Sequence, residues 1–160
     1  MDQPSADETF LREAIRLSRV RMRTGGAGPF GAVVVQDDRI VARGWNRVTA
    51  ANDPTAHAEV VAIRRACTRL RSFSLAGCIL YTSCEPCPMC LGAAYWARLD
   101  RLVFAAGRLD AAAAGFDDAF IYDELPLGPL ERSLPTSQLL REEAIAAFDA
   151  WLADPDRVPY

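Results

Sequence analysis

The chain has 160 residues, 51% of them hydrophobic, and a formal net charge of −3. This length is typical of one domain with a substantial core, so residues 1–160 are expected to form a single domain. Proteins that grip a phosphate backbone usually carry a basic surface, so the charge balance argues against a nucleic-acid partner. Apolar runs are too short to span a membrane, and no targeting segment is evident, so we expect a cytoplasmic protein that does not bind membranes.

The first predicted element is a helix that follows a capping-box pattern at Ser5-Ala6-Asp7-Glu8. Apolar side chains then recur on one stripe of the helix. A row of arginines lies on the opposite side: Arg12, Arg16, Arg19 and Arg23. Such a row is typical of a solvated helix face, and a nucleic-acid patch is the less favoured alternative.

A β-hairpin and a second helix come next. Residues 30–35 and 40–45 are β-rich runs joined at Asp37-Asp38, and Asn46 ends the second strand. Asp53 and Thr55 are suitable caps for a following helix that runs to about Leu70.

The central stretch of the chain is Thr82-Ser83-Cys84-Glu85-Pro86-Cys87-Pro88-Met89-Cys90, which follows an apolar strand at residues 79–81. Prolines suit the first turn of a helix, so the cysteines are expected at a helix N-terminus, where peptide dipoles favour the thiolate. Beyond it we expect a strand at residues 101–106, a short helix at 111–114, a Pro-rich linker at 125–135 and a helix at 142–152 with Ile145, Phe148 and Trp151 inward. This order predicts a three-layer α/β/α fold with a mixed sheet.

The cysteines and the single histidine form a metal-binding pattern. His57-Ala58-Glu59 together with Pro86-Cys87-Pro88-Met89-Cys90 matches the His-x-Glu and Pro-Cys-x-x-Cys pattern of zinc nucleobase deaminases. In this interpretation His57, Cys87 and Cys90 bind Zn²⁺, water takes the fourth position, and Glu59 is the general acid and base. His57 and Glu59 can serve one site only if it lies over the first turn of their helix.

Two other uses of these cysteines are open. A closed structural zinc site could use Cys84, Cys87, Cys90 and His57, although such a site has no need of Glu59. Disulfides are the second alternative, and the odd count of five cysteines without a signal peptide argues against them.

On these motifs the chain resembles the cytidine-deaminase-fold family and, within it, the bacterial guanine deaminases. The resemblance runs from residue 28 to residue 160. Its broad motifs are Asn46 and residues 53–59 and 84–87, and its more specific ones are residues 84–93, 95–98 and 114–118 and the closing Tyr160.

The resemblance implies a zinc-dependent hydrolysis of guanine to xanthine and ammonia. It also implies that Asn46 binds the purine edge, that Phe30 stacks near the base, and that Asp117 contacts the base or moves protons. In the family the C-terminal segment, residues 125–160 here, crosses to the partner subunit of a domain-swapped homodimer. Tyr160 would then close the neighbour's pocket.

The same motifs leave the substrate open. Guanosine, another amino-purine or an amino-triazine would undergo the same chemistry, because the pocket lid decides what fits. A tRNA adenosine deaminase shares both metal motifs, although the stretch Phe116-Asp117-Asp118 favours the guanine branch. A zinc module without catalytic activity is the alternative from a different class.

Overall fold

The computed structural model describes residues 4–25 and 27–160. The chain divides into two compact units, Met1–Asp118 and Ala119–Tyr160. No helix within the described residues combines the length and the apolar composition needed to cross a membrane.

The first unit contains a mixed four-stranded sheet in the order β2-β1-β3-β4. The strands are β1 (Gly31–Gln36), β2 (Arg39–Trp45), β3 (Cys78–Cys84) and β4 (Arg101–Ala106). β1 pairs antiparallel with β2 and with β3, whereas β3 and β4 run parallel. The predicted hairpin is confirmed, and Asp37 and Asp38 both have the positive φ angles of a tight hairpin turn.

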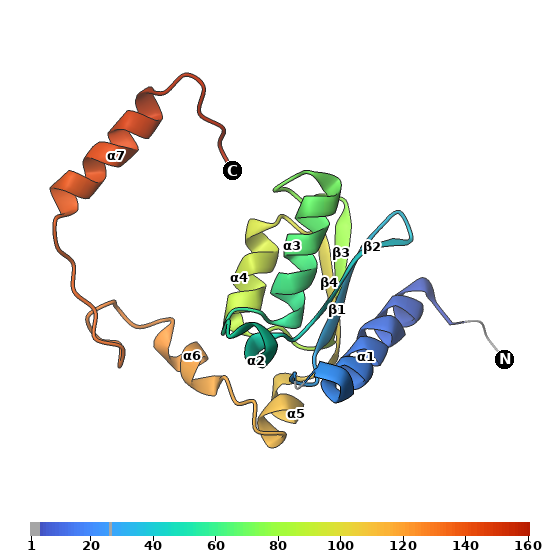
Figure 1. Ribbon diagram of the computed structural model, residues 1–160. Coiled ribbons are helices and arrows are strands. Elements are labelled where there is room, and N and C mark those ends of the chain that lie inside the picture. Colours follow the sequence, from blue (N-terminus) through green and yellow to red (C-terminus); the bar gives the residue numbers. More distant parts are fainter. Residues whose placement is uncertain (1–3, 26) are drawn as a thin grey trace. The chain divides into compact units, whose positions relative to one another are not determined.

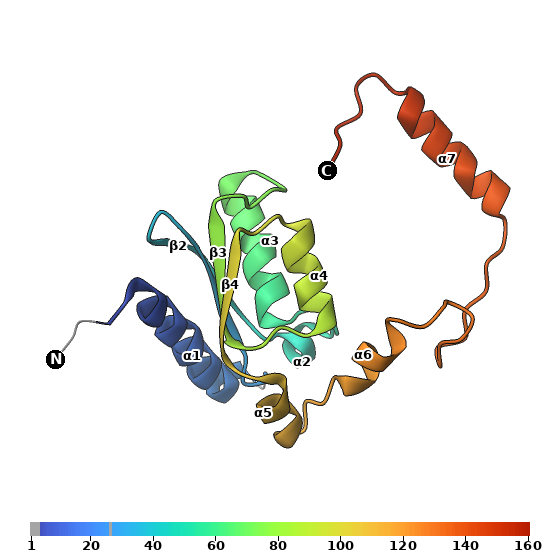
Figure 2. The ribbon, with the colours of Figure 1, turned by 180° about the vertical axis from the view of Figure 1, so that it is seen from behind.

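Helices cover both faces of this sheet (Figures 1 and 2). α1 (Ala6–Gly25) lies on one face, where Leu17 packs with Val33 and Tyr81. α3 (Ala58–Leu70) and α4 (Pro88–Trp96) lie on the other, where Ala62 packs with Val34 and Leu80. Side chains alternate between the two faces along each strand, so one sheet supplies both cores. The predicted three-layer fold with a mixed sheet is confirmed.

The start of α3 differs from the prediction. Asp53 and Thr55 do not cap this helix: the Thr55 backbone N–H donates to Asp53 Oδ1 at 2.8 Å, which closes a local turn. His57 is instead the residue that flanks the helix, with extended backbone angles, and a short helix α2 (Val48–Ala51) precedes that turn. The predicted end at Leu70 is confirmed.

The remaining helices are short or unburied. α5 (Arg108–Ala113) ends the ordered elements of the first unit, and the second unit contains α6 (Ala119–Glu124) and α7 (Arg141–Ala153). The prediction that Phe148 and Trp151 face inward is wrong within this chain, since they are 67% and 42% exposed. The reason is that neither α6 nor α7 contains a buried residue, so the second unit by itself has no core for them to join.

Candidate metal centre and active site

Two helix N-termini bring the predicted metal ligands together. His57 flanks the start of α3, Cys87 flanks the start of α4, and Cys90 lies in the first turn of α4. Pro88 occupies the first position of α4, where its missing N–H costs no hydrogen bond. Because the N-terminal peptide dipoles favour negative charge, both helices support thiolates at this point.

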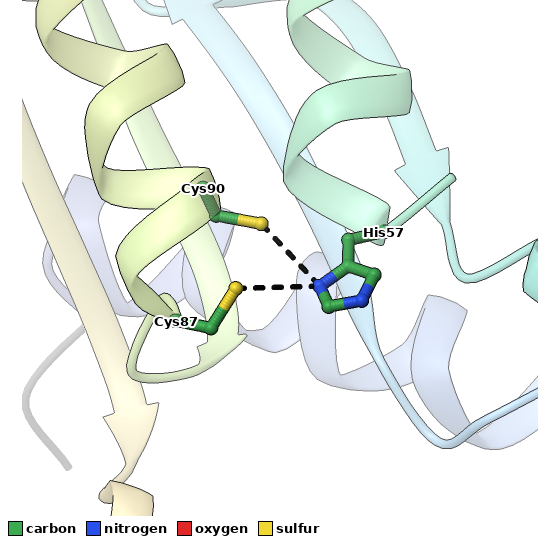
Figure 3. Close-up of side chains that lie close together, drawn as sticks. All are labelled: His57, Cys87 and Cys90. Carbon is green, nitrogen blue, oxygen red and sulfur yellow. Dashed lines mark hydrogen bonds between the residues drawn. The ribbon is translucent and has the colours of Figure 1, made fainter. Parts of the chain in front are cut away.

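The three donor atoms have the spacing of a zinc site. His57 Nδ1 lies 3.5 Å from Cys87 Sγ and 3.5 Å from Cys90 Sγ (Figure 3). All three donor atoms lie within 4.8 Å of one another. Ordinary zinc–nitrogen and zinc–sulfur bond lengths at a tetrahedral angle place such donors about 3.6 Å apart. One imidazole and two thiols are also the ligand types that zinc prefers, so the residues present fit this metal.

The structure excludes the two other uses of the cysteines within the described residues. Cys84 is not part of the donor group, and its Sγ donates to the carbonyl of Gly107 at 3.7 Å. The closed site with four protein ligands is therefore not formed. All five cysteines are free thiols, which excludes the disulfide alternative.

Hydrogen bonds within the centre give the two thiols different acidities. The Cys90 thiol and His57, which lie beside Cys87, lower the pKa of Cys87 to about 4. The neighbouring Cys87, together with burial, raises the pKa of Cys90 far above its usual range. The bond to Cys87 also raises the pKa of His57. Without metal, Cys87 is therefore the thiolate and Cys90 holds a proton.

Glu59 lies in the first turn of α3, as the predicted shared site requires, and is only 5% exposed. Burial raises the pKa of its carboxyl group. Cys90 Sγ donates to Glu59 Oε2 at 3.5 Å, which places this carboxyl beside the metal ligands. A carboxyl group with a raised pKa next to a metal centre is suited to carry protons near neutral pH.

Asn46 and Phe30 lie together at Gly28. Asn46 is 7% exposed, and its Oδ1 accepts hydrogen bonds from the backbone N–H groups of Gly28 at 3.4 Å and Val48 at 3.2 Å. A side-chain carbon added to Gly28 would lie 3.3 Å from the Phe30 ring and 3.4 Å from Asn46 Cγ. The Phe30 ring also meets Phe116 edge to face, with 4.9 Å between ring centroids.

The two aspartates after Phe116 differ in their surroundings. Asp117 is exposed, whereas Asp118 is partly buried. Burial raises the pKa of Asp118, and the negative charge of Cys87 adds to this effect. Sequence reasoning selected Asp117, which stays a prediction, since adjacent aspartates give no signal of which one serves the site. Tyr160 belongs to the second unit and is 72% exposed.

The family assignment follows from this site and from similarity to known proteins. Residues 4–106, which include every proposed metal ligand, match the model described as the cytidine and deoxycytidylate deaminase zinc-binding region. The chain belongs to this family of zinc-dependent deaminases. It is therefore a hydrolase whose metal is zinc, as the motifs predicted.

Three relatives within the family indicate its branch. Guanine deaminase from Bacillus subtilis is 55% identical over 90% of this chain and 92% of its own length. The alignment with the crystal structure of that protein covers 100% of this chain and 99% of the crystallised chain, with a TM-score of 0.93 and 51% identity. Guanine deaminase from Nitrosomonas europaea is 35% identical, with a TM-score of 0.67 over 73% of this chain and 68% of that chain. The tRNA-specific adenosine deaminase of Aquifex aeolicus is more distant, at 39% identity over 84% of this chain and 91% of its own. The predicted resemblance to bacterial guanine deaminases is confirmed.

Proposed function

We propose that this chain hydrolyses guanine to xanthine and ammonia. The observation that carries this proposal is the buried Glu59 carboxyl beside three zinc-type donors, in a chain 55% identical to a guanine deaminase over nearly its whole length. The relation to tRNA deaminases is weaker in identity. A purine base is therefore the small-molecule partner that we propose.

The proton transfers fall to Glu59. When bound, zinc supplies Lewis acidity that lowers the pKa of a water molecule to about 7 and so provides a nucleophile at neutral pH. Glu59 accepts the proton that this water loses and returns it to the purine ring nitrogen. Glu59 then moves the remaining proton of the added hydroxyl group to the amino group, and the carbon–nitrogen bond breaks to release ammonia. The water oxygen becomes the new carbonyl oxygen of xanthine.

The neighbouring residues hold the base. The two backbone N–H groups that bind Asn46 Oδ1 fix the orientation of its amide, so its NH₂ group is the end that we assign to an acceptor on the purine edge. Phe30, braced edge to face by Phe116, provides a ring for the base to stack against. Asp118 is our candidate for a second proton carrier, because its carboxyl is partly buried and its pKa is raised by burial and by the charge of Cys87. Asp117, for which the resemblance implied this role, stays a prediction.

We also propose a homodimer in which residues 125–160 pack against the partner subunit and Tyr160 closes the partner's pocket. The second unit supports this proposal because its apolar side chains lack a core of their own: Phe120, Leu130, Leu139, Phe148 and Leu152 are each more than 60% exposed. In the first unit, Leu91 and Tyr95 on α4 are 40% and 77% exposed. Exposed apolar side chains in such numbers are typical of a protein surface that binds a partner. The cytoplasmic location stays a prediction.

The test of the reaction is an ultraviolet and ammonia-release assay on zinc-loaded protein. The assay compares four small molecules in parallel: guanine, guanosine, 2,6-diaminopurine and melamine. An adenosine-containing tRNA anticodon stem-loop is tested as the nucleic-acid substrate. We expect stoichiometric xanthine and ammonia from guanine. Turnover of guanosine or the stem-loop in preference to guanine would contradict the proposal.

Subunit complementation tests the exchange of Tyr160. One variant carries Glu59→Gln with an intact tail, and the other has an intact site but lacks Tyr160. Each alone is expected to be nearly inactive. After mixing and refolding, activity should return, because the first variant donates its tail to the site of the second. Mixtures no more active than the separate variants would contradict the exchange.

A further inference from the structure

Glu59 has a second buried hydrogen-bond donor that the motifs do not include. The Thr82 hydroxyl donates to Glu59 Oε1 at 3.3 Å. Thr82 is 1% exposed and Glu59 5% exposed, so water does not compete strongly for this bond. A buried hydroxyl that donates to a carboxyl group fixes its orientation as well as stabilising it.

The position of Thr82 makes it a rigid support. It lies on β3, an inner strand of the sheet, and its backbone is paired with Ala32 of β1 and with Phe104 of β4. Side chains alternate along the strand, so Tyr81 faces α1 whereas Thr82 faces the helix that carries Glu59. Thr82 is β-branched, and its χ1 angle has few alternatives. The hydroxyl is therefore held by the sheet and not by a loop.

The two oxygens of Glu59 have different neighbours. Oε1 meets the Thr82 hydroxyl on the sheet, whereas Oε2 meets Cys90 Sγ at 3.5 Å. Oε1 therefore meets a hydroxyl that is fixed to the sheet, whereas Oε2 is the oxygen on the side of the metal ligands.

We propose that Thr82 is the positioning residue of the proton carrier: it anchors Glu59 Oε1 to the sheet and so presents Oε2 to the water and the purine. This inference rests on the proposed deaminase function. It predicts that the two carboxyl oxygens of Glu59 have different roles: Oε1 is held by Thr82, and Oε2 exchanges protons. Thr82 itself touches neither the substrate nor the metal ligands in this scheme.

The experiment compares zinc-loaded Thr82→Val and Thr82→Ser proteins with the wild type. Valine keeps the shape and the β-branch of threonine but lacks the hydroxyl, whereas serine keeps the hydroxyl. We expect Thr82→Val to lower kcat by about tenfold to a hundredfold, as expected for loss of a hydrogen bond to a charged group. KM should stay within about twofold and the zinc content should be unchanged, while Thr82→Ser should recover most of kcat.

Tyr81→Phe is the matched control. Tyr81 is the preceding residue on β3, is 2% exposed, and its hydroxyl donates to the Asp7 carboxylate at 2.7 Å on the other face of the sheet. Its loss also removes a partly buried hydroxyl bond to a carboxylate from the same strand. We expect Tyr81→Phe to lower the melting temperature without changing kcat. An equal fall of kcat in both variants, or full kcat in Thr82→Val, would overturn the inference.

A spectroscopic arm separates this inference from the proposed function. Kinetics are measured on whichever amino-purine the wild type deaminates. A lack of activity on guanine would therefore contradict the proposed substrate but would not affect the role of Thr82. In metal-free protein, Thr82→Val should shift an infrared carboxyl band. In a Glu59→Gln background, which lacks this carboxyl, the same substitution should leave the carboxyl region of the spectrum unchanged. No shift in the Glu59-containing protein would overturn the anchoring of Oε1.

Discussion

Gly44 on β2 lies directly against the backbone of Ala58 at the start of α3. A side-chain carbon on Gly44 would overlap the Ala58 carbonyl oxygen and lie 2.6 Å from the backbone nitrogen of Ala62. Only glycine allows this approach, because the obstructing atoms are backbone and cannot move away singly. Strand β2 thereby sets the position of the helix turn that carries His57 and Glu59.

Replacing Gly44 tests this contact. We expect Gly44→Ala to destabilise the protein by about 1–3 kcal/mol, as overpacking of a core does, and to weaken zinc retention by displacing the first turn of α3. Chemical denaturation and metal analysis measure both effects. Gly92→Ala is the control, because nothing lies within 4 Å of the added carbon on α4. This variant should be neutral or slightly stabilising, and equal losses in the two variants would contradict the account.

Cys84→Ser distinguishes the open metal centre from a closed one. Cys84 lies outside the donor group, so its replacement should leave zinc content near that of the wild type. Cys90→Ser removes a donor and should lower zinc affinity by at least about tenfold. Competition with a chromogenic chelator measures both affinities. An equal loss in Cys84→Ser would restore the structural-zinc interpretation.

Alkylation of metal-free protein tests the unequal thiols. The pKa of Cys87 is lowered to about 4, chiefly by the Cys90 thiol, whereas burial or hydrogen bonding raises the pKa of the other four cysteines. At pH 6, iodoacetamide should label Cys87 first, as located by peptide mass spectrometry. Zinc loading should protect it. Labelling that spreads evenly over the five cysteines would contradict the assigned thiolate.

Much of the site could be predicted because its chemistry is local in sequence. His57 and Glu59 lie two residues apart, and Cys87 and Cys90 three apart, so spacing and helix signals alone placed them over two first turns. The contact of Thr82 with Glu59 escaped prediction because it joins residues distant in sequence. The Thr82–Glu59 bond spans 23 residues, and neither residue type marks such a bond in advance.

The fold shows the same division between local and distant effects. Proline and aspartate signals located α4 and the hairpin turn, whereas the start of α3 was misplaced. Asp53 and Thr55 are good caps by type, yet they bond each other, and Asp53 also lies 3.7 Å from Arg64. The apolar stripe of α7 predicted a helix correctly but could not reveal that the second unit has no core of its own.

An acid-sensitive link between α1 and β2 gives a pH prediction. Arg16 at 2.7 Å and Arg43 at 2.8 Å, through hydrogen bonds, lower the pKa of Glu13 from 4.5 to about 2. A lowered carboxyl pKa stabilises the fold above about pH 4.5, and this stabilisation is lost as the pH falls toward 2. Solvent screening limits it to about 1 kcal/mol at pH 7. In urea denaturation, Glu13→Gln should be less stable than the wild type at pH 7, with the gap narrowing below about pH 4.5 and closing near pH 2. Glu8→Gln, at the exposed Arg12 pair, is the control and should change stability little.

Two single substitutions test which of the adjacent aspartates, Asp117 or Asp118, transfers protons. Asp118 is partly buried and its pKa is raised, so Asp118→Asn should lower kcat on guanine by tenfold or more if it carries protons. Asp117→Asn at the exposed neighbour should have the smaller effect. Steady-state kinetics at matched zinc content compare them. A larger loss in Asp117→Asn would return the proton role to Asp117.

The central claim is that Glu59 carries protons beside a zinc centre that it does not help to form. Glu59→Gln tests it most directly, because glutamine keeps the size of the side chain but cannot accept and return protons. The measurement is guanine turnover together with zinc content in the purified variant. We predict zinc at the wild-type level and a loss of at least about a thousandfold in kcat. Substantial turnover at full zinc occupancy would contradict the account.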